Sequence, residues 1–490
     1  MKLTDVLFVS NCIVPWVYAA TVRVVNTTTL GQDPQTVNRL NGESFQQDAL
    51  ATFNGYQYAA FYVVDASNTS VRHPSLARRA LRGLDTAWES FSFTDYNQTD
   101  DDGHDIISLG ISHGDGTVHI GFDQHDNNLN YRVSKAGVAT NPEEGDWSSA
   151  LFSSVLDYLP GLESLDKSVY FINITYPRFL AIPTAARSEA AGADLLLELR
   201  VGRSGLGDDW LYKYTPNKGW SQIGRYLEVS IGSGVNNNAY INGIDFDLRG
   251  NLHATWTYRD YVNDGGQDVA VEAGPNGPEN NHDMNFAYSS DVGATWLNNW
   301  NQTIANMSSQ EPIVPVSAGI AIFGIPKYGG ILNQEAQTVD GEGRVHVLNR
   351  ENTTGTERWY HYWRSTVGHW TRTPLPLAPD LVSKNNVTGT PTVIGKRGKL
   401  VAPPDSPHHS LLAILPSNAP NSSALSILRS TAAGHFRDWE AVWEVPSGCG
   451  WEPLFDRYRL DTSTGGDGIL SLFLVNGSAI QVVDLEVTGV

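Results

Sequence analysis

Residues 101–135 read DDGHDIISLGISHGDGTVHIGFDQHDNNLNYRVSK, and the middle of this stretch is typical of a β-hairpin. Apolar residues alternate with small or polar ones from Ile107 to Ile111 and again from Val118 to Phe122, the pattern of half-buried strands. The turn between them, His-Gly-Asp-Gly at 113–116, contains glycines that adopt positive φ without strain. We therefore predict two antiparallel strands over 107–111 and 118–122.

Two histidines flank this hairpin at its open end. His104 precedes the first strand and His125 follows the second, so folding the hairpin brings both imidazoles to the same end. Histidine is the side chain that titrates near neutral pH without help, which makes such a pair a candidate for proton transfer. The alternative is that both are loop histidines with no catalytic role.

A turn glycine followed by an alternating apolar strand recurs seven times along the chain. Three of these units share the sharper pattern Gly-x-[Leu/Val]-His, at His119, His253 and His346. Regular units of this kind are typical of a closed array of sheets, so we predict an all-β, seven-bladed β-propeller. The segment Ser289–Trp296 (SSDVGATW) is similar to the Asp-box turn between outer strands of sialidase-like blades. The seven glycines are Gly55, Gly116, Gly192, Gly250, Gly343, Gly398 and Gly468.

The hairpin argument extends to the following units. In each, one polar or aromatic residue enters the inner strand and an arginine leaves the next strand after the turn. Because a propeller brings the same end of its inner strands around one axis, these residues should gather with His104 and His125. The predicted set adds Tyr176 with Arg200, Tyr240 with Arg259, and Asn333-Gln334 with Arg350.

Composition limits the partners. The 490 residues carry a net charge of −20, which disfavours nucleic acid and anionic membranes as partners but leaves room for a basic cleft that binds an anionic substrate. Apolar content of 41% and charged content of 18% fit a globular protein with a sizeable core. No motif indicates an organic cofactor, and we expect a monomer.

The N-terminus is typical of an export signal. Met1-Lys2 is followed by an apolar run that ends in Val-Tyr-Ala-Ala at 17–20, so we predict a signal peptide over 1–20 and one catalytic domain over 21–490. Without Cys12 the mature chain keeps only Cys449, which excludes an internal disulfide. We expect a secreted glycoprotein, since ten Asn-x-Ser/Thr sequons are present: Asn26, Asn68, Asn97, Asn173, Asn301, Asn306, Asn352, Asn386, Asn421 and Asn476.

Tyrosine, histidine and arginine around an anionic sugar suit β-elimination. A uronate has an acidic proton at C5 beside its carboxylate and a leaving glycosidic oxygen at C4. Removal of that proton builds negative charge on the carboxylate, which an arginine neutralises, while a histidine or tyrosine moves the protons. No Gly-x-Ser-x-Gly elbow is present, and no carboxylate pair is obviously placed for glycoside hydrolysis.

Several motifs resemble the BNR-repeat polysaccharide lyases, which include ulvan lyases and fungal rhamnose–glucuronate lyases. The similarity runs from about Gly42 to the C-terminus and implies a seven-bladed propeller that cleaves eliminatively beside a uronate. By motif it implies catalytic roles for His104, His125, Tyr176 and Arg200, and a substrate contact for Arg259. The motifs are Asp102-Gly-His104, Asp115-Gly-x-Val-His119, His125, Tyr131-Arg132, Tyr176-Pro-Arg-Phe179, Arg200-x-Gly-x-Ser-Gly205, Asn281-His-Asp283 and His361-Tyr-Trp-Arg364.

The predicted substrate is a uronate polysaccharide, and a secreted chain of this kind favours rhamnosyl-glucuronate over algal ulvan. Substrate contacts are expected from Arg259, Tyr240, Asn281, His282, Gln334 and Arg350.

We also expect the Arg200 guanidinium to lower the pKa of Tyr176 and bias it towards the base. Some family members bind zinc through several cysteines, which Cys449 alone cannot reproduce, and the resemblance allows a structural calcium ion near the axis. Two alternatives stay open: a sialidase-like glycoside hydrolase, although Phe323-Gly-Ile-Pro326 lacks the arginine of the Phe-Arg-Ile-Pro motif, and a non-catalytic carbohydrate-binding propeller.

Overall fold

The computed structural model describes most of the chain after the N-terminal segment. The predicted signal peptide, apart from Ala20, and the sequon at Asn386 lie outside the described residues. Within the part that is described, no helix is long and apolar enough to cross a membrane. The described residues are 20–43, 48–82, 87–203, 205–229, 235–262, 281–376, 396–404, 406, 409–417, 419, 421–462 and 465–489.

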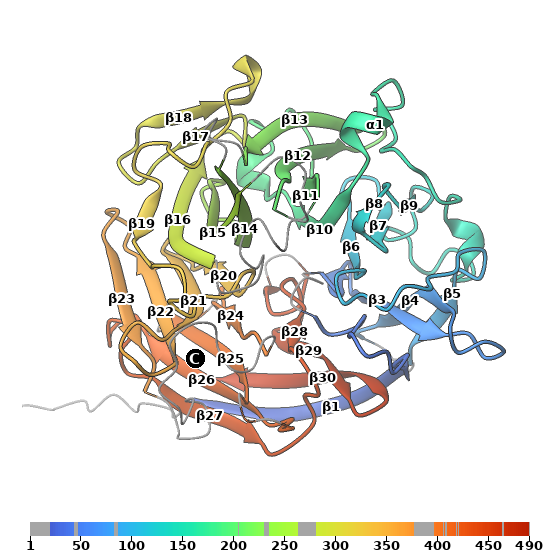
Figure 1. The fold of residues 1–490 in the computed structure, drawn as a ribbon. Helices are drawn as coiled ribbons and strands as arrows, with labels where there is room; N and C mark the ends of the chain where they lie inside the picture. The colour runs from blue at the N-terminus through green and yellow to red at the C-terminus, as the bar shows by residue number, and fades with distance from the viewer. Residues whose placement is uncertain are drawn as a thin grey trace, which may run out of the picture.

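Seven small antiparallel sheets stand around a common axis, which confirms the predicted all-β, seven-bladed propeller (Figure 1). The first three blades consist of β2 (Leu50–Phe53), β3 (Tyr56–Val64), β4 (Arg72–Ala80) and β5 (Glu89–Ser92); of β6 (Ile107–Ile111), β7 (Val118–Phe122) and β9 (Tyr131–Val133); and of β8 (His125–Asn127), β10 (Ile174–Ala181), β11 (Leu195–Val201), β12 (Asp208–Thr215) and β13 (Gly219–Leu227).

The next three blades follow the same plan, with short helical turns such as α1 (Lys167–Tyr170) confined to the connections. They consist of β14 (Val235–Phe246), β15 (Leu252–Val262), β16 (Asn281–Ser289), β17 (Thr295–Leu297), β18 (Thr303–Asn306) and β19 (Ala321–Phe323); of β20 (Ala336–Val339), β21 (Val345–Glu351), β22 (Arg358–Arg364) and β23 (Trp370–Pro374); and of β24 (Lys399–Val401), β25 (Ser410–Pro416), β26 (Leu425–Thr431) and β27 (Glu440–Val445).

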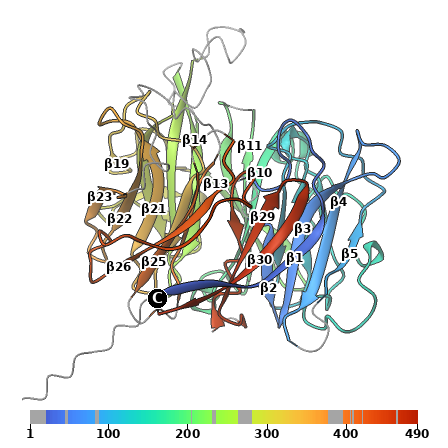
Figure 2. The ribbon, with the colours of Figure 1, turned by 90° about the horizontal axis from the view of Figure 1, so that it is seen from below.

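The seventh blade joins the two ends of the described chain. Strand β1 (Thr21–Gln32) pairs with β30 (Ala479–Thr488), beside β29 (Ile469–Asn476) and β28 (Leu454–Phe455). The antiparallel register runs from Thr21 opposite Thr488 to Gln32 opposite Ala479, and the two strands lie side by side in Figure 2. Hydrogen bonds between segments more than 440 residues apart therefore close the ring.

The predicted hairpin is confirmed, with strands β6 and β7 over 107–111 and 118–122 and Ile107 opposite Phe122. The expectation of half-buried strands is wrong, because every residue of both strands is buried. A propeller blade has a neighbouring blade on each face, so its inner strands are covered on both sides.

Seven apolar clusters fill the seven blade-to-blade interfaces within the described residues. Between the first two blades, Tyr58 and Tyr62 pack with Leu109 and Ile120. Between the seventh and the first blade, Phe473 packs with its neighbours from β3. Each fully buried aliphatic or aromatic side chain contributes about 1.5–3 kcal/mol, so the interfaces hold the ring rigid and fix the position of the strand ends.

The turn glycines fall in seven different blades, as predicted. Six of them, Gly116 with φ +68° among them, come shortly before β3, β7, β11, β15, β21 or β29. Gly398 differs, because it precedes β24, the first strand of its blade. There the absent side chain makes room, since a Cβ would lie 2.8 Å from Cδ2 of Leu348.

The Asp-box segment forms the turn between β16 and β17, as its sequence predicted. The Asp291 carboxylate accepts hydrogen bonds from the backbone N–H and the hydroxyl of Thr295, at 2.7 Å each. The Trp296 side chain is fully buried beneath the turn. This turn is a structural element of the outer strands and lies outside the histidine cluster.

Candidate active site

His104 and His125 come from two different blades. His104 lies in the loop before β6, whereas His125 is the first residue of β8, which leaves the hairpin and pairs with β10 of the next blade. His125 lies opposite Thr175 in this pairing, next to Tyr176. The chain thus passes from one blade to the next at this point and carries the second imidazole with it.

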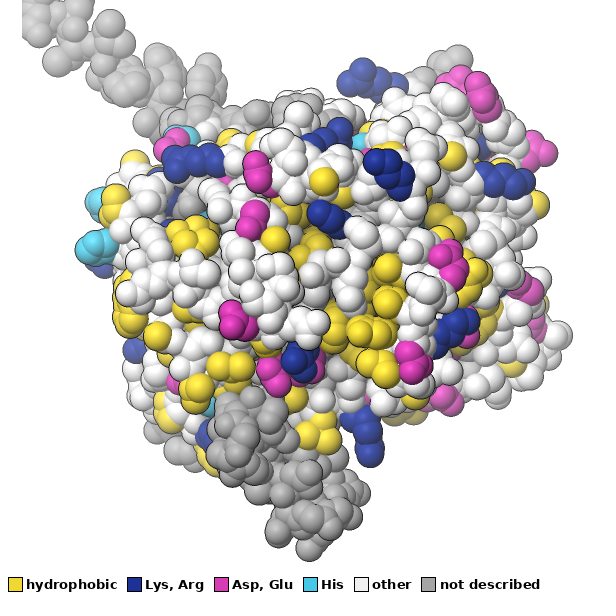
Figure 3. Space-filling model, turned by 90° about the horizontal axis from the view of Figure 1, so that it is seen from above, with side chains coloured by type: hydrophobic (Ala, Val, Ile, Leu, Met, Phe, Trp, Pro, Cys, Tyr) yellow, Lys and Arg dark blue, Asp and Glu magenta, His cyan; other side chains and the backbone are white. Residues whose placement is uncertain are grey.

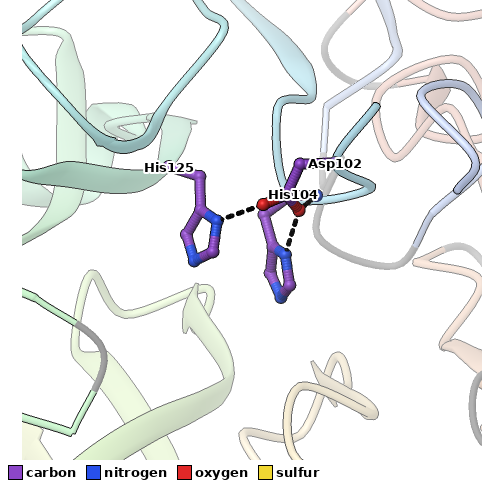
Figure 4. A group of neighbouring side chains, drawn as sticks. All are labelled: Asp102, His104 and His125. Atoms are coloured by element: carbon purple, nitrogen blue, oxygen red, sulfur yellow. Dashed lines mark hydrogen bonds and ion pairs between the residues drawn. The ribbon is translucent and has the colours of Figure 1, made fainter. Parts of the chain in front are cut away.

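The two imidazole rings are stacked, with centroids 4.1 Å apart and planes inclined by 22°. Their Nδ1 atoms both bond to the Asp102 carboxylate, His104 to Oδ1 and His125 to Oδ2, each at 2.6 Å. Figure 4 shows both rings extending in the same direction from this carboxylate. Both imidazoles therefore lie at the same end of the hairpin, as its predicted fold requires.

The Asp102 carboxylate is ionised in this arrangement. Partial burial opposes ionisation, but hydrogen bonds from His104 and His125 outweigh it and hold the pKa of Asp102 well below its usual range. Burial lowers the pKa of His104, and so do the charges on His125 and Arg200. The hydrogen bond to Asp102 raises this pKa, but the net shift is downward. His104 is therefore neutral at physiological pH and can accept a proton.

Tyr176 lies beside the histidines, with its ring centroid 6.0 Å from that of His104. Its backbone has φ +61°, a left-handed conformation that is unusual for a bulky residue, and the pairing of β10 with β11 is interrupted at this point by a bulge. A β-bulge redirects a side chain relative to the regular pleat. Here the bulge lies where the Tyr176 ring points towards His104 and Tyr240. The ring centroids of Tyr176 and Tyr240 are 6.4 Å apart.

Arg200 lies across the rings of both tyrosines. Its Cζ is 4.8 Å from the Tyr176 ring centroid and 5.8 Å from that of Tyr240. Nη2 donates to the Thr175 hydroxyl at 3.1 Å and lies 3.9 Å from the Asp126 carboxylate. Nε and Nη1 have no hydrogen-bond partner among the described residues, although the side chain is only 1% exposed. A buried guanidinium with two unpaired nitrogens is suited to an anionic ligand.

Arg200 does not turn Tyr176 into a phenolate in the free protein. Burial raises the pKa of Tyr176 above its ordinary value, and the opposing charge of Arg200 does not offset this effect. The expected direction of the Arg200 effect is correct, but the net shift is the reverse of our expectation. Tyr176 is a neutral phenol and can donate a proton.

Arg259, Tyr240 and Asn281 form a second group next to Arg200. The Cζ of Arg259 lies 4.4 Å from the Tyr240 ring centroid, and its Nη1 bonds to the Tyr240 hydroxyl at 3.3 Å. Nε donates to the Asn281 side-chain oxygen at 2.9 Å. The Asn333 side-chain oxygen accepts from Arg259 Nη2 at 3.4 Å, and Asn333 in turn donates to Gln334 at 3.1 Å. These predicted residues are connected as one network.

His282 lies next to Asn281 on β16 but has carboxylate partners of its own. It bonds to Asp260 at 2.7 Å and to Asp283 at 3.0 Å. Burial lowers its pKa, but the two carboxylates outweigh burial and raise the pKa of His282 to about 9. With Lys327, which is paired with Asp260, it lines an open pocket. His282 is a cation at neutral pH and its predicted sugar contact stays a prediction.

Arg350 has a different setting from Arg200. It is fully buried, and its guanidinium lies 3.5 Å from Glu335 and 3.4 Å from Glu357, stacked over the Trp359 ring. Two carboxylates balance its charge and protein covers its side chain. The structure therefore places the predicted Arg350 in an internal ion-pair network, away from solvent.

Two residues of the site, Asp102 and Arg397, carry no role in the sequence-based prediction. Asp102 bonds both histidines. The sequence feature that could have indicated it is the spacing Asp-x-His in the motif Asp102-Gly-His104. Arg397, which donates to the Asn333 carbonyl at 2.7 Å and pairs with Glu452 at 3.0 Å, comes from the sixth blade. Asn333 connects Arg397 to Arg259. The seven-unit repeat placed Asn333 at the right strand end, but no local signal indicated Arg397.

Among the described residues, one group of three side chains has donor atoms close enough together to hold a metal ion. It consists of Asp102, His104 and His125, whose donor atoms all lie within 4.8 Å of one another. Two imidazole nitrogens and one carboxylate suit zinc or a similar transition metal. Calcium prefers six to eight oxygen ligands, so this donor set does not fit calcium. The calcium ion near the axis stays a prediction from the resemblance.

Comparisons with known proteins agree with the fold. The polysaccharide lyase Uly1 is similar in structure, with a TM-score of 0.64 and 15% identity, over 94% of this chain and 99% of that one. A PL25 ulvan lyase bound to -[GlcA(1-4)Rha3S]- has a TM-score of 0.61 and 13% identity, over 93% and 97% of the two chains. No curated protein matches by sequence. A family model described as "BNR repeat-containing family member" matches residues 56–377, about two thirds of the sequence, and the chain therefore belongs to the BNR repeat-containing family.

Proposed function

We propose that the protein is a secreted polysaccharide lyase that cleaves the glycosidic bond at C4 of a glucuronate by β-elimination. The observation that carries this proposal is the contact between His104, His125, Tyr176 and Arg200, which places two imidazoles, one phenol and one guanidinium side by side. Two proton carriers and an anion-binding fork are the groups that elimination next to a carboxylate requires.

The unpaired nitrogens of Arg200 are the proposed contact for the substrate carboxylate. Each of these nitrogens forms a planar fork with the second N–H of Nη2, and such a fork can bind both carboxylate oxygens at once. Because these nitrogens have no partner in the part of the chain that is described, the carboxylate need not displace a protein group. Charge that develops on the carboxylate as C5 loses its proton would be stabilised there.

The protonation states favour a division of roles. His104 accepts the C5 proton, because burial keeps it neutral. The electrons of the C5–H bond form the C4–C5 double bond, and the C4–O bond breaks. Tyr176 gives its proton to the leaving oxygen, because burial keeps it a phenol. One proton is taken up and one is released in each turnover, so returning the first from His104 to Tyr176 restores the starting state.

The proposed substrate is a rhamnosyl-glucuronate polymer. The PL25 neighbour is bound to an oligosaccharide of glucuronate and sulfated rhamnose. At 13% identity that neighbour supports the fold, so the sugar specificity rests on the resemblance of the motifs and on the arrangement of Arg200 and Arg259 around two tyrosines. Stacking on tyrosine faces suits a sugar ring, and the arginines suit its carboxylate.

An absorbance assay tests the proposal. The protein is incubated separately with a rhamnosyl-glucuronate plant gum, ulvan and a neutral polysaccharide, and the ultraviolet absorbance of the unsaturated uronate is followed over time. We expect signal with the first, a lower rate or none with ulvan, and none with the neutral polymer. New reducing ends without ultraviolet absorbance would indicate a glycoside hydrolase instead. Binding of the polymer without any cleavage would indicate a carbohydrate-binding propeller.

Secretion is part of the proposal. The predicted signal segment ends where the first described strand begins, at Thr21. Mass spectrometry of the protein from the medium of a eukaryotic host should find a new N-terminus near residue 21 and glycans on exposed sequons. Asn352 is buried and should carry none. The exposed sequon asparagines are Asn26, Asn68, Asn97, Asn301, Asn421 and Asn476.

A further inference from the structure

The Asp102 carboxylate connects the two histidines of the site. Each of its oxygens accepts a hydrogen bond from one Nδ1, both at 2.6 Å, and Oδ1 also accepts from the backbone N–H of His104 at 3.0 Å. Asp102 thus fixes both ring positions with its two oxygens, and the loop backbone fixes the carboxylate. Figure 4 shows the two rings extending from it in the same direction.

An ionised carboxylate can only accept hydrogen bonds. Both Nδ1 atoms must therefore carry a hydrogen, and in a neutral imidazole the lone pair is then on Nε2. Carboxylates that bond one ring nitrogen of a histidine commonly select the tautomer in this way. Here a single carboxylate does so for two rings that are stacked 4.1 Å apart.

We propose that Asp102 is a positioning residue that holds both His104 and His125 in the Nδ1–H tautomer, so that the lone pair of each stacked ring is on Nε2. This inference rests on the proposed lyase function and specifies how its proton acceptor is prepared. The C5 proton of the uronate binds one Nε2, and the resulting imidazolium is balanced by the Asp102 charge. The same proton leaves at the end of the turnover, so the pair returns to its neutral form.

Charged groups lie on several sides of the two rings, and the negative Asp102 carboxylate bonds to both of them. Arg200 adds a positive charge that opposes protonation of His104. Asp126, which lies next to His125 in sequence, is near Arg200 at 3.9 Å, and the neutral Tyr176 completes the immediate neighbourhood.

Asp102→Asn tests the tautomer directly. Its amide oxygen can accept from one Nδ1, but its NH2 group donates, so the second histidine must change tautomer or lose its bond. Long-range ¹H–¹⁵N NMR of ¹⁵N-histidine-labelled protein, in buffer with a chelator to remove any bound metal, reports the protonated nitrogen of each ring without substrate. We expect Nδ1–H signals from His104 and His125 in the wild type and one Nε2–H signal in the variant.

Kinetics on the uronate polymer give the second readout. We expect kcat of Asp102→Asn to fall about 10²- to 10⁴-fold, as for other lost acid–base function, with KM changed less than threefold and the acidic limb of the pH–rate profile displaced. Asp102→Glu keeps two accepting oxygens and should retain both Nδ1–H tautomers and part of the activity. Asp100→Asn, an exposed change in the same loop, is the matched control and should behave as the wild type.

The two proposals fail in different ways. Nε2–H signals for both histidines in the folded wild type, or an Asp102→Asn variant with wild-type tautomers and wild-type kcat, would overturn the role of Asp102. If both Nδ1–H signals are present but the wild type releases no unsaturated product from any uronate polymer, the lyase proposal fails while the positioning role of Asp102 stands. Thermal unfolding of each variant shows whether a loss of activity reflects a loss of fold.

Discussion

Replacing Arg200 with lysine should separate a bidentate contact from simple charge attraction. Lysine keeps the positive charge, but it is a single ammonium group in place of a planar fork that lies over Tyr176 and Tyr240. The existing Nη2 bond to Thr175 can be replaced by the ammonium group. The Nε and Nη1 donors, which have no partner among the described residues, cannot both be replaced.

The magnitude follows from the donors that are lost. Loss of one donor to a developing negative charge costs about 2.7–4 kcal/mol in transition-state stabilisation. Since each 1.36 kcal/mol corresponds to a factor of ten, kcat/KM of Arg200→Lys should fall about 100- to 900-fold. A model in which only the charge matters predicts almost no loss, so the two explanations differ by more than a factor of ten.

The assay is the initial rate of unsaturated-product formation from a glucuronate oligosaccharide, with affinity measured by calorimetry on the same ligand. Arg203→Lys is the matched control, because Arg203 is exposed in the turn after β11. Thermal unfolding must show that both variants are folded. A folded Arg200→Lys protein with less than a threefold loss in kcat/KM would refute the bidentate contact and leave Arg200 as a structural cation.

Three further outcomes are expected. Tyr176→Phe should lose about 10²- to 10⁴-fold in kcat with oligosaccharide affinity within threefold of the wild type by calorimetry, and an active variant would leave Tyr176 as a sugar platform. His104→Ala and His125→Ala should each lose a similar factor without unfolding, whereas near wild-type rates in both would make them structural. The pKa of the buried Asp105 is raised to about 8, mainly by burial and then by Asp123 and other carboxylates. Asp105 is therefore protonated in the folded protein below that pH. In the unfolded chain the Asp105 carboxyl ionises near pH 4. As the pH rises from 4 to 8, the free energy of unfolding of the wild type therefore falls by up to about 1.4 kcal/mol per pH unit. Asp105→Asn should therefore gain stability relative to the wild type in urea unfolding on going from pH 5 to pH 8, and an equal difference at both pH values would contradict this.

The local pattern of the chain was sufficient for the architecture. Alternation over 107–111 and 118–122 gave the hairpin with its observed bounds, and a turn glycine in each of seven units gave the number of blades. These signals are local, because side-chain direction in a strand alternates with every residue and a tight turn needs particular φ values. The same regularity placed His104, His125, Tyr176 and Arg200 at one end of their blades, since strand ends repeat with the units.

The tertiary structure decided how these groups are used. Transfer of His125 to the sheet of β10, the left-handed backbone of Tyr176 and the two bonds of Asp102 depend on how two blades meet. A sequence motif does not contain that information, because each interaction joins segments whose separation is set by packing.

Burial and charge balance were likewise a property of the folded ring. Arg200 and Arg350 occupy the same position in their sequence units, and both are buried. Glu335 and Glu357 balance the charge of Arg350, whereas Arg200 keeps two nitrogens without a partner in the described chain and lies over two tyrosines. The sequence by itself determined which side chains reach the strand ends; only the packed structure determined which of them are neutralised, because desolvation and ion pairing depend on groups from several blades at once.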